Sequence, residues 1–247
     1  MTTSSGFDQA IVLALVVGSG INLGRNRLMV GDDNLIRKIR YSQCKEEYMY
    51  LTDSTDRLII RRHPEVYDPA EDTLLLAENL TVNKNDRVLE VGVGSGYVSL
   101  IAAQKAESVV GTDINVHAVR LAKLNARLNN IRNVDFVLGD LLGPIGKRFS
   151  LILINPPYLP DATRIERRPI DLSWNGGKDG RSMVDRFLGE VEEYLDPGGR
   201  IQMVQSSASG YGKTMENLAA LNFKVTKVAE KRFFFESIYV LEATKTE

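Results

Sequence analysis

The chain has 247 residues, a length that suits one α/β domain with an appendage or at most two small domains. Apolar residues make up 43% of the sequence, which is enough for a hydrophobic core and argues against global disorder. Because 31 Lys and Arg stand against 32 Asp and Glu, for a net charge of −1, the chain lacks the broad positive field of proteins that bind nucleic-acid phosphates.

The single cysteine, Cys44, excludes a disulfide framework or a cysteine-rich zinc site within the chain, so we expect a reducing, cytoplasmic location and no bound metal. The continuous apolar run Ala10–Val17 is too short to span a bilayer. It follows Asp8 and no Lys or Arg, so it lacks the basic start of a signal peptide. We therefore interpret it as a buried strand or a short core helix and expect no membrane segment.

Two zones follow one another along the chain. Residues 1 to about 60 show no regular alternation of strands and helices, although residues 58–60 (Leu-Ile-Ile) form a possible strand. From about Val66 onward, short apolar strands alternate with helical patterns, as in a parallel sheet that is covered on both faces. We predict seven strands there, at Arg87–Val91, Ser108–Asp113, Val134–Leu138, Phe149–Ile154, Gly199–Gln205, Phe223–Ala229 and Phe235–Leu241.

The first of these strands runs into a glycine-rich loop that contains Gly92, Gly94 and Gly96. Glycines let the backbone turn sharply and approach a ligand closely. The loop alone is a weak indication, since NAD, FAD and S-adenosylmethionine sites all use one. Two details favour S-adenosylmethionine. The spacing is GxGxG rather than GxGxxG, and Glu90 stands at the strand end, where it would repel a pyrophosphate but suit a positively charged sulfonium.

Acidic residues also end the next two strands. Asp113 ends the second strand, where a carboxylate can accept both ribose hydroxyls. Asp140 follows the third strand, where it can accept the adenine amino group while Leu141 packs on the ring. Each acid alone is more simply explained as a cap or turn residue. Three acids at successive strand ends indicate a ligand site, because ligands bind at the carboxyl ends of the strands in such sheets.

An amphipathic helix is predicted between the second and third strands. Asn115 is its expected N-cap, since its side chain can accept a free backbone N–H. Leu121, Leu124 and Leu128 fall at helical spacing on one face, which we expect to be the apolar one. Basic residues between them fall on another face and should be solvated.

The fourth strand ends abruptly in Asn155-Pro156-Pro157-Tyr158. The two prolines fix φ and remove two backbone donors, so the loop is rigid and offers the Asn155 side-chain oxygen and the Pro156 carbonyl as acceptors. An NH₂ group that donates to both would direct its lone pair at a methyl group, and Tyr158 offers a flat face to a planar group. The alternative is a tight Pro-Pro turn after a core strand. Beside a cofactor half-site we interpret the four residues as the catalytic loop of an N-methyltransferase, in which geometry supplies most of the rate.

The last two strands indicate a hairpin. Phe223–Ala229 and Phe233–Leu241 are separated by a charged turn at residues 230–232 (Glu-Lys-Arg), and a hairpin requires antiparallel pairing. The expected fold is therefore α/β. It is a doubly wound, Rossmann-like, seven-stranded methyltransferase sheet, mostly parallel with one antiparallel strand.

These residues resemble those of the NPPY-type methyltransferases, and within them the archaeal and eukaryotic branch of the HemK-type release-factor glutamine methyltransferases. Three stretches carry the resemblance, His63–Thr73, Val88–Tyr158 and Trp174–Arg181, and it covers about residues 61–241. The Asn-Pro-Pro-Tyr loop alone is shared with adenine and guanine methyltransferases. The resemblance implies that Thr73 and Asn155 contact the cofactor and that the first stretch covers its methionine end.

The resemblance also implies the reaction, which is methyl transfer from S-adenosylmethionine to the glutamine amide of a Gly-Gly-Gln loop in a translation release factor. Methylation of adenine or guanine in RNA or DNA by the same loop is the alternative, and it predicts a basic groove. A binding subunit without chemistry is a third possibility, against which the intact catalytic loop argues. Residues 1–48 match no pattern of this branch, so we divide the chain into an N-terminal extension of unknown role (1–48) and an S-adenosylmethionine-dependent methyltransferase domain (49–247).

In the expected strand order, Val134–Leu138 lies at one edge of the sheet. It is apolar and carries neither Pro nor Lys, so the usual protections of an edge strand are absent. We therefore expect this edge to be paired. Three partners are possible. The first is a small zinc-binding activator protein, which the resemblance implies. The others are a second copy of the chain and the N-terminal extension folding back through Ala10–Val17.

Overall fold

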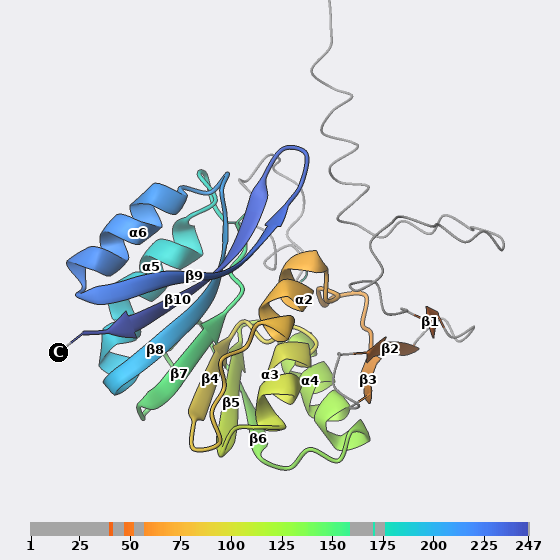
Figure 1. Cartoon of the computed structure of the whole chain (residues 1–247). Coiled ribbons are helices and arrows are strands. Elements are labelled where there is room, and N and C mark those ends of the chain that lie inside the picture. The colour runs from red at the N-terminus through yellow and green to blue at the C-terminus, as the bar shows by residue number, and fades with distance from the viewer. Residues whose placement is uncertain (1–39, 42–46, 52–56, 159–169, 171–175, 247) are drawn as a thin grey trace, which may run out of the picture. The chain divides into compact units, whose positions relative to one another are not determined.

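The computed structural model describes residues 40–41, 47–51, 57–158, 170 and 176–246 (Figure 1). The larger of its two sheets has seven strands in the order β6-β5-β4-β7-β8-β10-β9. In that order they span Val134–Leu138, Ser108–Asp113, Arg87–Val91, Phe149–Ile154, Leu195–Ser206, Ser237–Lys245 and Phe223–Arg232. The first five pair in parallel, whereas β10 runs antiparallel to β8 and β9. The predicted fold class is confirmed, and the first four strands have their predicted bounds.

The predicted turn of the final hairpin is wrong. Residues 230–232 belong to β9 and pair with β10, and the chain reverses at Phe233–Glu236 instead. The Phe233 N–H donates to the Glu236 carbonyl over 2.7 Å and closes this turn. The charges mislead because β9 is an edge strand, on which ion-paired charges are common. Glu230 accepts from both Lys227 and Arg232.

Alternate residues of the strands enter two hydrophobic clusters, one on each face of the sheet. In β7, Leu151 and Leu153 belong to one cluster and Ile152 and Ile154 to the other, as the period of two in a strand requires. One face is covered by α2 (Glu71–Glu78), α3 (Tyr97–Ala103) and α4 (Val116–Leu128), and the other by α5 (Ser182–Glu190), the 3₁₀ helix η2 (Val191–Tyr194) and α6 (Tyr211–Ala220) (Figure 1). Burial on both faces explains why the strands read as continuous apolar runs.

The apolar face predicted for α4 is only partly right. Leu121 is buried, but Leu124 and Leu128 are 42% and 37% exposed. Small residues take the buried positions instead, among them Ala118, Ala122 and Ala126. The helix needs them because it lies close to the glycine loop: a Cβ on Gly96 would stand 2.9 Å from the Ala122 Cβ. The predicted N-cap is confirmed, since the Asn115 Oδ1 accepts from the His117 N–H over 2.9 Å.

A second, antiparallel sheet joins β1 (Arg40–Tyr41), β2 (Glu47–Leu51) and β3 (Arg57–Arg61). It contains the possible strand at residues 58–60. Asparagine side chains of α4 and its C-cap fix β3 in place: the Asn129 amide bonds to both backbone groups of Ile59. Strand β2 crosses residue 48, the proposed boundary of the N-terminal extension. Ala10–Val17 lies outside the described residues, and among the described ones no helix is long and apolar enough to cross a membrane.

Candidate functional site

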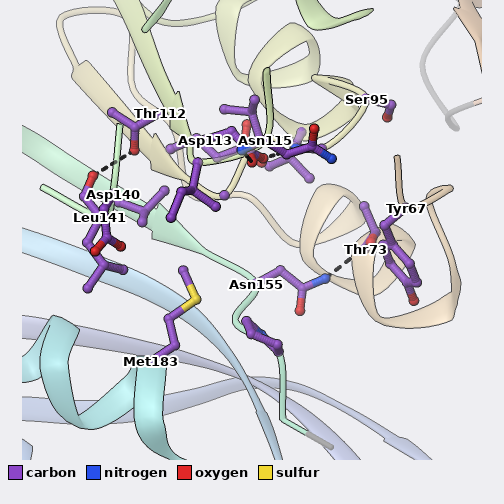
Figure 2. Close-up of a pocket in the computed structure, with 18 of the residues that line it drawn as sticks. Tyr67, Thr73, Ser95, Thr112, Asp113, Asn115, Asp140, Leu141, Asn155 and Met183 are labelled. Carbon is purple, nitrogen blue, oxygen red and sulfur yellow. Dashed lines mark hydrogen bonds between the residues drawn. The ribbon is translucent and has the colours of Figure 1, made fainter. Parts of the chain in front are cut away.

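A pocket opens at the carboxyl ends of β4, β5 and β7, where the loops after these strands meet α2 and α5 (Figure 2). The structure brings most of the predicted site residues together in its lining, namely Thr73, Glu90, Gly92, Gly94, Asp113, Asp140, Leu141, Asn155 and Pro157. The lining also holds residues to which the sequence assigned no ligand role, including Tyr67, Ile114, Asn115, Met183 and Arg186. Gly96, Pro156 and Tyr158 are not among the lining residues in the described part of the chain.

The three glycines of the loop between β4 and α3 have two different structural roles. Gly92 and Gly94 line the pocket with φ of +78° and +52°, a backbone conformation that favours glycine. The Gly94 N–H donates to the Asp113 carboxylate over 3.0 Å, so the loop is fastened to the end of β5. Gly96, with φ of +83°, instead forms the start of α3 and permits the close packing of α4. We interpret the first two as ligand-facing and the third as structural.

Two carboxylates face this loop, that of the buried Glu90 and that of the half-buried Asp113. Glu90 accepts a hydrogen bond from the Ser99 hydroxyl, yet burial raises the pKa of its carboxyl to about 8. Burial likewise raises the pKa of Asp113, against the opposing effect of the Asn115 and Gly94 N–H groups that donate to it. Its two oxygens accept one backbone bond each, at 2.8 Å and 3.0 Å. A carboxylate offers about four lone-pair sites, so the geometry leaves room for the two ribose hydroxyls.

Asp140, the acidic residue that follows β6, forms an ion pair across the pocket. Asp140 forms an ion pair with Arg186 of α5 at 2.6 Å, and both side chains are about half exposed. Such an exposed pair contributes at most about 1 kcal/mol, so Asp140 can exchange it for a ligand group. The adjoining Leu141 is buried, and its carbonyl accepts from the Thr112 hydroxyl over 2.9 Å. Both residues line the pocket, and their contact with an adenine stays a prediction.

A hydrogen-bond chain fixes the orientation of Asn155, and Figure 2 shows its last bond, between Asn155 and Thr73. Asp72 of α2 accepts from the Thr73 hydroxyl over 3.2 Å, and a carboxylate can only accept. The Thr73 oxygen must then accept in turn, and it does so from the Asn155 Nδ2 over 3.2 Å. The Asn155 Oδ1 is left buried with no hydrogen-bond partner among the described residues. The chain thus presents Asn155 to the pocket as an acceptor.

Tyr158 is tied to the same carboxylate. Its hydroxyl donates to the Asp72 Oδ2 over 3.2 Å, and the Tyr67 hydroxyl donates to the Oδ1 over 3.4 Å. Burial, followed by the charge of Asp72, raises the pKa of both phenols above the ordinary value, so both remain neutral. The Tyr158 ring packs against the core cluster on the α2 side of the sheet. The stacking face expected of Tyr158 stays a prediction.

The segment that contains Gly180 and Arg181 packs against the catalytic loop. Gly180 has a φ of +75°, and a Cβ there would stand 2.3 Å from the Tyr158 carbonyl oxygen, so only glycine allows this approach. The next residue, Arg181, is buried, and its guanidinium donates to the Ser209 carbonyl, the Gly210 carbonyl and the Thr214 hydroxyl. Gly180 therefore lets the chain pass close to Tyr158, and Arg181 fastens this segment to the start of α6. Trp174 and Asn175 of the same motif lie outside the described residues.

The residues present fit S-adenosylmethionine. The pocket has a loop of positive-φ glycines for close backbone approach, carboxylates that suit a cation and two hydroxyls, and an unpartnered amide oxygen. Sequence reasoning missed Asp72, Met183 and Arg186. Asp72 stood inside the quoted His63–Thr73 motif, which was its available signal. Met183 and Arg186 of α5 reach the pocket only through folding, so no local sequence signal indicates them.

Comparisons with known proteins identify methyltransferases. A family model described as Methyltransferase small domain matches residues 58–168. A Methanocaldococcus jannaschii protein described as a protein N5-glutamine methyltransferase is 46% identical over 189 residues, which cover 74% of this chain and 94% of that protein. Human methyltransferase HEMK2 is 30% identical over 199 residues, 74% of this chain and 91% of that one. Among solved structures, an E. cuniculi Mtq2–Trm112 complex, described as responsible for methylation of the termination factor eRF1, matches with a TM-score of 0.60 and 24% identity over 74% of this chain and 99% of that one.

Proposed function

Since the chain belongs to the family of S-adenosylmethionine-dependent protein N5-glutamine methyltransferases, we propose that it methylates the glutamine side-chain amide of the Gly-Gly-Gln loop in a translation release factor. The observation that carries this proposal is the Asn155 Oδ1, which is buried in the pocket lining without a donor among the described residues. Leaving such an acceptor unpaired costs about 1–3 kcal/mol. A substrate NH₂ group would supply the missing donor.

The catalytic loop does its work by holding the substrate nitrogen. One N–H of the amide donates to the Asn155 Oδ1 and the other to the Pro156 carbonyl, so the nitrogen lone pair points along the remaining direction. When bound, S-adenosylmethionine supplies an electrophilic methyl group. Asn155 and Pro156 would hold the nitrogen in line with that methyl group, and the surplus amide proton would leave to solvent after the transfer. This transfer needs no general base, and positioning supplies most of the rate.

The edge of the sheet supports a second proposal, concerning a partner. Strand β6 pairs with β5 on one side, and on its other side the described residues provide no strand. Leu138 is 51% exposed there, and Ile114 and Val137 are exposed beside it. We propose that a small zinc-binding activator protein covers this edge, as Trm112 accompanies Mtq2 in the matched structure. Amides of residues 134–138 should exchange fast in the isolated chain and slowly with the activator; protection in the isolated monomer would contradict this.

The division of the chain stays a proposal as well. We propose that the methyltransferase occupies residues 49–247 and that residues 1–48 form an N-terminal extension of unknown role. Because β2 (Glu47–Leu51) crosses this boundary, a chain that starts at Met49 cuts the small sheet. The proposed substrate would place the enzyme in the cytoplasm, where translation occurs.

A labelled-methyl transfer assay tests the substrate. The protein, with and without activator, is incubated with labelled S-adenosylmethionine and with either a release factor or total RNA. We expect label in the release factor alone, and label confined to RNA would support adenine or guanine methylation instead. The Asn155→Ala variant is the matched control. It should keep most of its cofactor affinity and lose most turnover, because the Asn155 oxygen positions the reacting nitrogen; near wild-type turnover would contradict the mechanism.

A further inference from the structure

The tip of the β9–β10 hairpin presents three successive phenylalanines. Phe234 is 92% exposed and Phe235 is 72% exposed, with their rings edge to face and their centroids 4.6 Å apart, and Phe233 is also exposed. Exposing adjacent aromatic side chains to water is unfavourable, since each can bury about 150–250 Å². Clustered apolar side chains of this kind mark interaction sites. Nothing in the methyl-transfer geometry requires them.

The tip is held rigidly. Besides the hydrogen bond that closes the turn, the Ser206 hydroxyl donates to the Glu236 carboxylate over 2.6 Å. Ser207 and Ser237 exchange two hydrogen bonds of 2.9 Å each, which fasten the start of β10 to the end of β8. The phenylalanines are therefore displayed on a fixed turn, and little conformational entropy is lost when a partner covers them.

The base of the tip lies beside residues that support the catalytic loop. Glu236 lies near enough to Tyr158 of the catalytic loop for its charge to raise the pKa of that phenol, after burial and the charges of Asp72 and Tyr67. Lys231, at the base of the tip, forms an ion pair with Glu71 at the start of α2, next to Asp72. Figure 1 shows the hairpin projecting beyond the rest of the sheet.

The charges around the tip favour a protein over a nucleic acid. Lys227 and Arg232 both pair with Glu230, and Lys231 pairs with Glu71. Each of these cations stands beside a carboxylate of the chain itself, so the tip presents little unbalanced positive charge to a phosphate backbone. The phenylalanines present apolar surface, which a folded protein domain can match with apolar surface of its own.

We propose that Phe233–Phe235 form a docking surface for an apolar patch on the folded protein substrate, beside the loop that carries the target glutamine. This proposal rests on the proposed function. The tip supplies affinity for the whole substrate protein, whereas the pocket recognises the glutamine. Docking therefore lowers the KM for the folded protein, and it leaves the chemistry at Asn155 and the recognition of a short peptide unchanged.

The test uses the double variant Phe234→Ser/Phe235→Ser in the full chain with its activator. Its substrates are a release factor and a short peptide that contains the Gly-Gly-Gln loop. We expect the KM for the release factor to rise about 10- to 100-fold from the loss of two buried phenylalanines, with kcat, peptide turnover and melting temperature unchanged. The matched control is Leu124→Ser/Leu128→Ser, which removes two exposed apolar side chains from α4. It should leave the KM unchanged.

An unchanged KM in the tip variant, or an equal rise in the control, would overturn the docking proposal while the enzyme still labels the release factor. An equal loss on peptide and protein would overturn it too, because the tip would then act on the catalytic loop. Sedimentation that shows a dimer for the wild type and a monomer for the tip variant would also overturn the proposal, since the tip would then bind a second copy of the chain. If the wild-type protein labels neither substrate, the proposed function fails and this proposal fails with it.

Discussion

Replacing Thr73 by valine tests the hydrogen-bond chain that orients the catalytic amide. Valine keeps the shape of the side chain and removes the hydroxyl that accepts from the Asn155 Nδ2. The productive orientation of Asn155 then leaves a buried NH₂ group without an acceptor, at a cost of about 1–3 kcal/mol relative to orientations that reach water. At about 1.4 kcal/mol per factor of ten, the productive fraction falls by about 5- to 150-fold, and kcat/KM for the protein substrate falls with it.

Two measurements separate this role from direct contact with the cofactor. Calorimetry with S-adenosylmethionine should give nearly wild-type affinity for Thr73→Val, whereas steady-state kinetics should show the loss. Thr73→Ser retains the hydroxyl and should keep most of the wild-type kcat/KM. A Thr73→Val enzyme with wild-type kcat but weakened cofactor binding would refute the reasoning, because Thr73 would then serve the cofactor alone.

Further predictions concern the cofactor and the N-terminus. Asp113→Ala should weaken S-adenosylmethionine binding by about 10- to 150-fold, from about 1.5–3 kcal/mol per charged hydrogen bond; unchanged affinity in calorimetry would remove the ribose role. Burial raises the pKa of Glu90 to about 8, above its value in the unfolded chain. Between about pH 5 and 8, Glu90 is therefore largely protonated in the folded protein and largely ionised in the unfolded chain. Stability of the unliganded protein should therefore fall as pH rises from about 5 to 8, and Glu90→Gln should flatten this decline in a series of thermal melts. A cationic sulfonium favours the ionised form, so the affinity for S-adenosylmethionine relative to the neutral product S-adenosylhomocysteine should rise over pH 6 to 8 in the wild type and stay level in Glu90→Gln; equal slopes would place the sulfonium away from Glu90. A chain that starts at Lys38 keeps β1 and β2 and should melt at a higher temperature than one that starts at Met49, if the small sheet supports α4 through Asn129.

The sheet could be predicted because its signals are local. Parallel strands that are buried on both faces read as short apolar runs, and the carboxylates that end them stand at positions set by the strand bounds. Asp113, Asp140 and the glycine loop were therefore found from the sequence, and the structure brings them into one pocket.

The errors and omissions arise where packing, and not hydropathy, decides. Leucines at helical spacing suggested a core face for α4, but Leu124 and Leu128 are exposed because the close approach to Gly96 admits only small residues such as Ala122. The hairpin turn was misplaced because ion-paired charges on an edge strand resemble a loop. The hydrogen-bond chain from Asp72 to Asn155 depends on the bond between Thr73 and Asn155, which are 82 positions apart, and no local pattern reports it.

The central claim is that this enzyme methylates a glutamine side chain of a release factor, and the position of the transferred methyl group tests it most directly. A release factor incubated with the protein, its activator and S-adenosylmethionine is digested, and its peptides are fragmented in a mass spectrometer. We expect a gain of one methyl group on the glutamine of the Gly-Gly-Gln loop, absent from the Asn155→Ala reaction. A methyl group found on another residue, or found only on RNA from a parallel reaction, would contradict it.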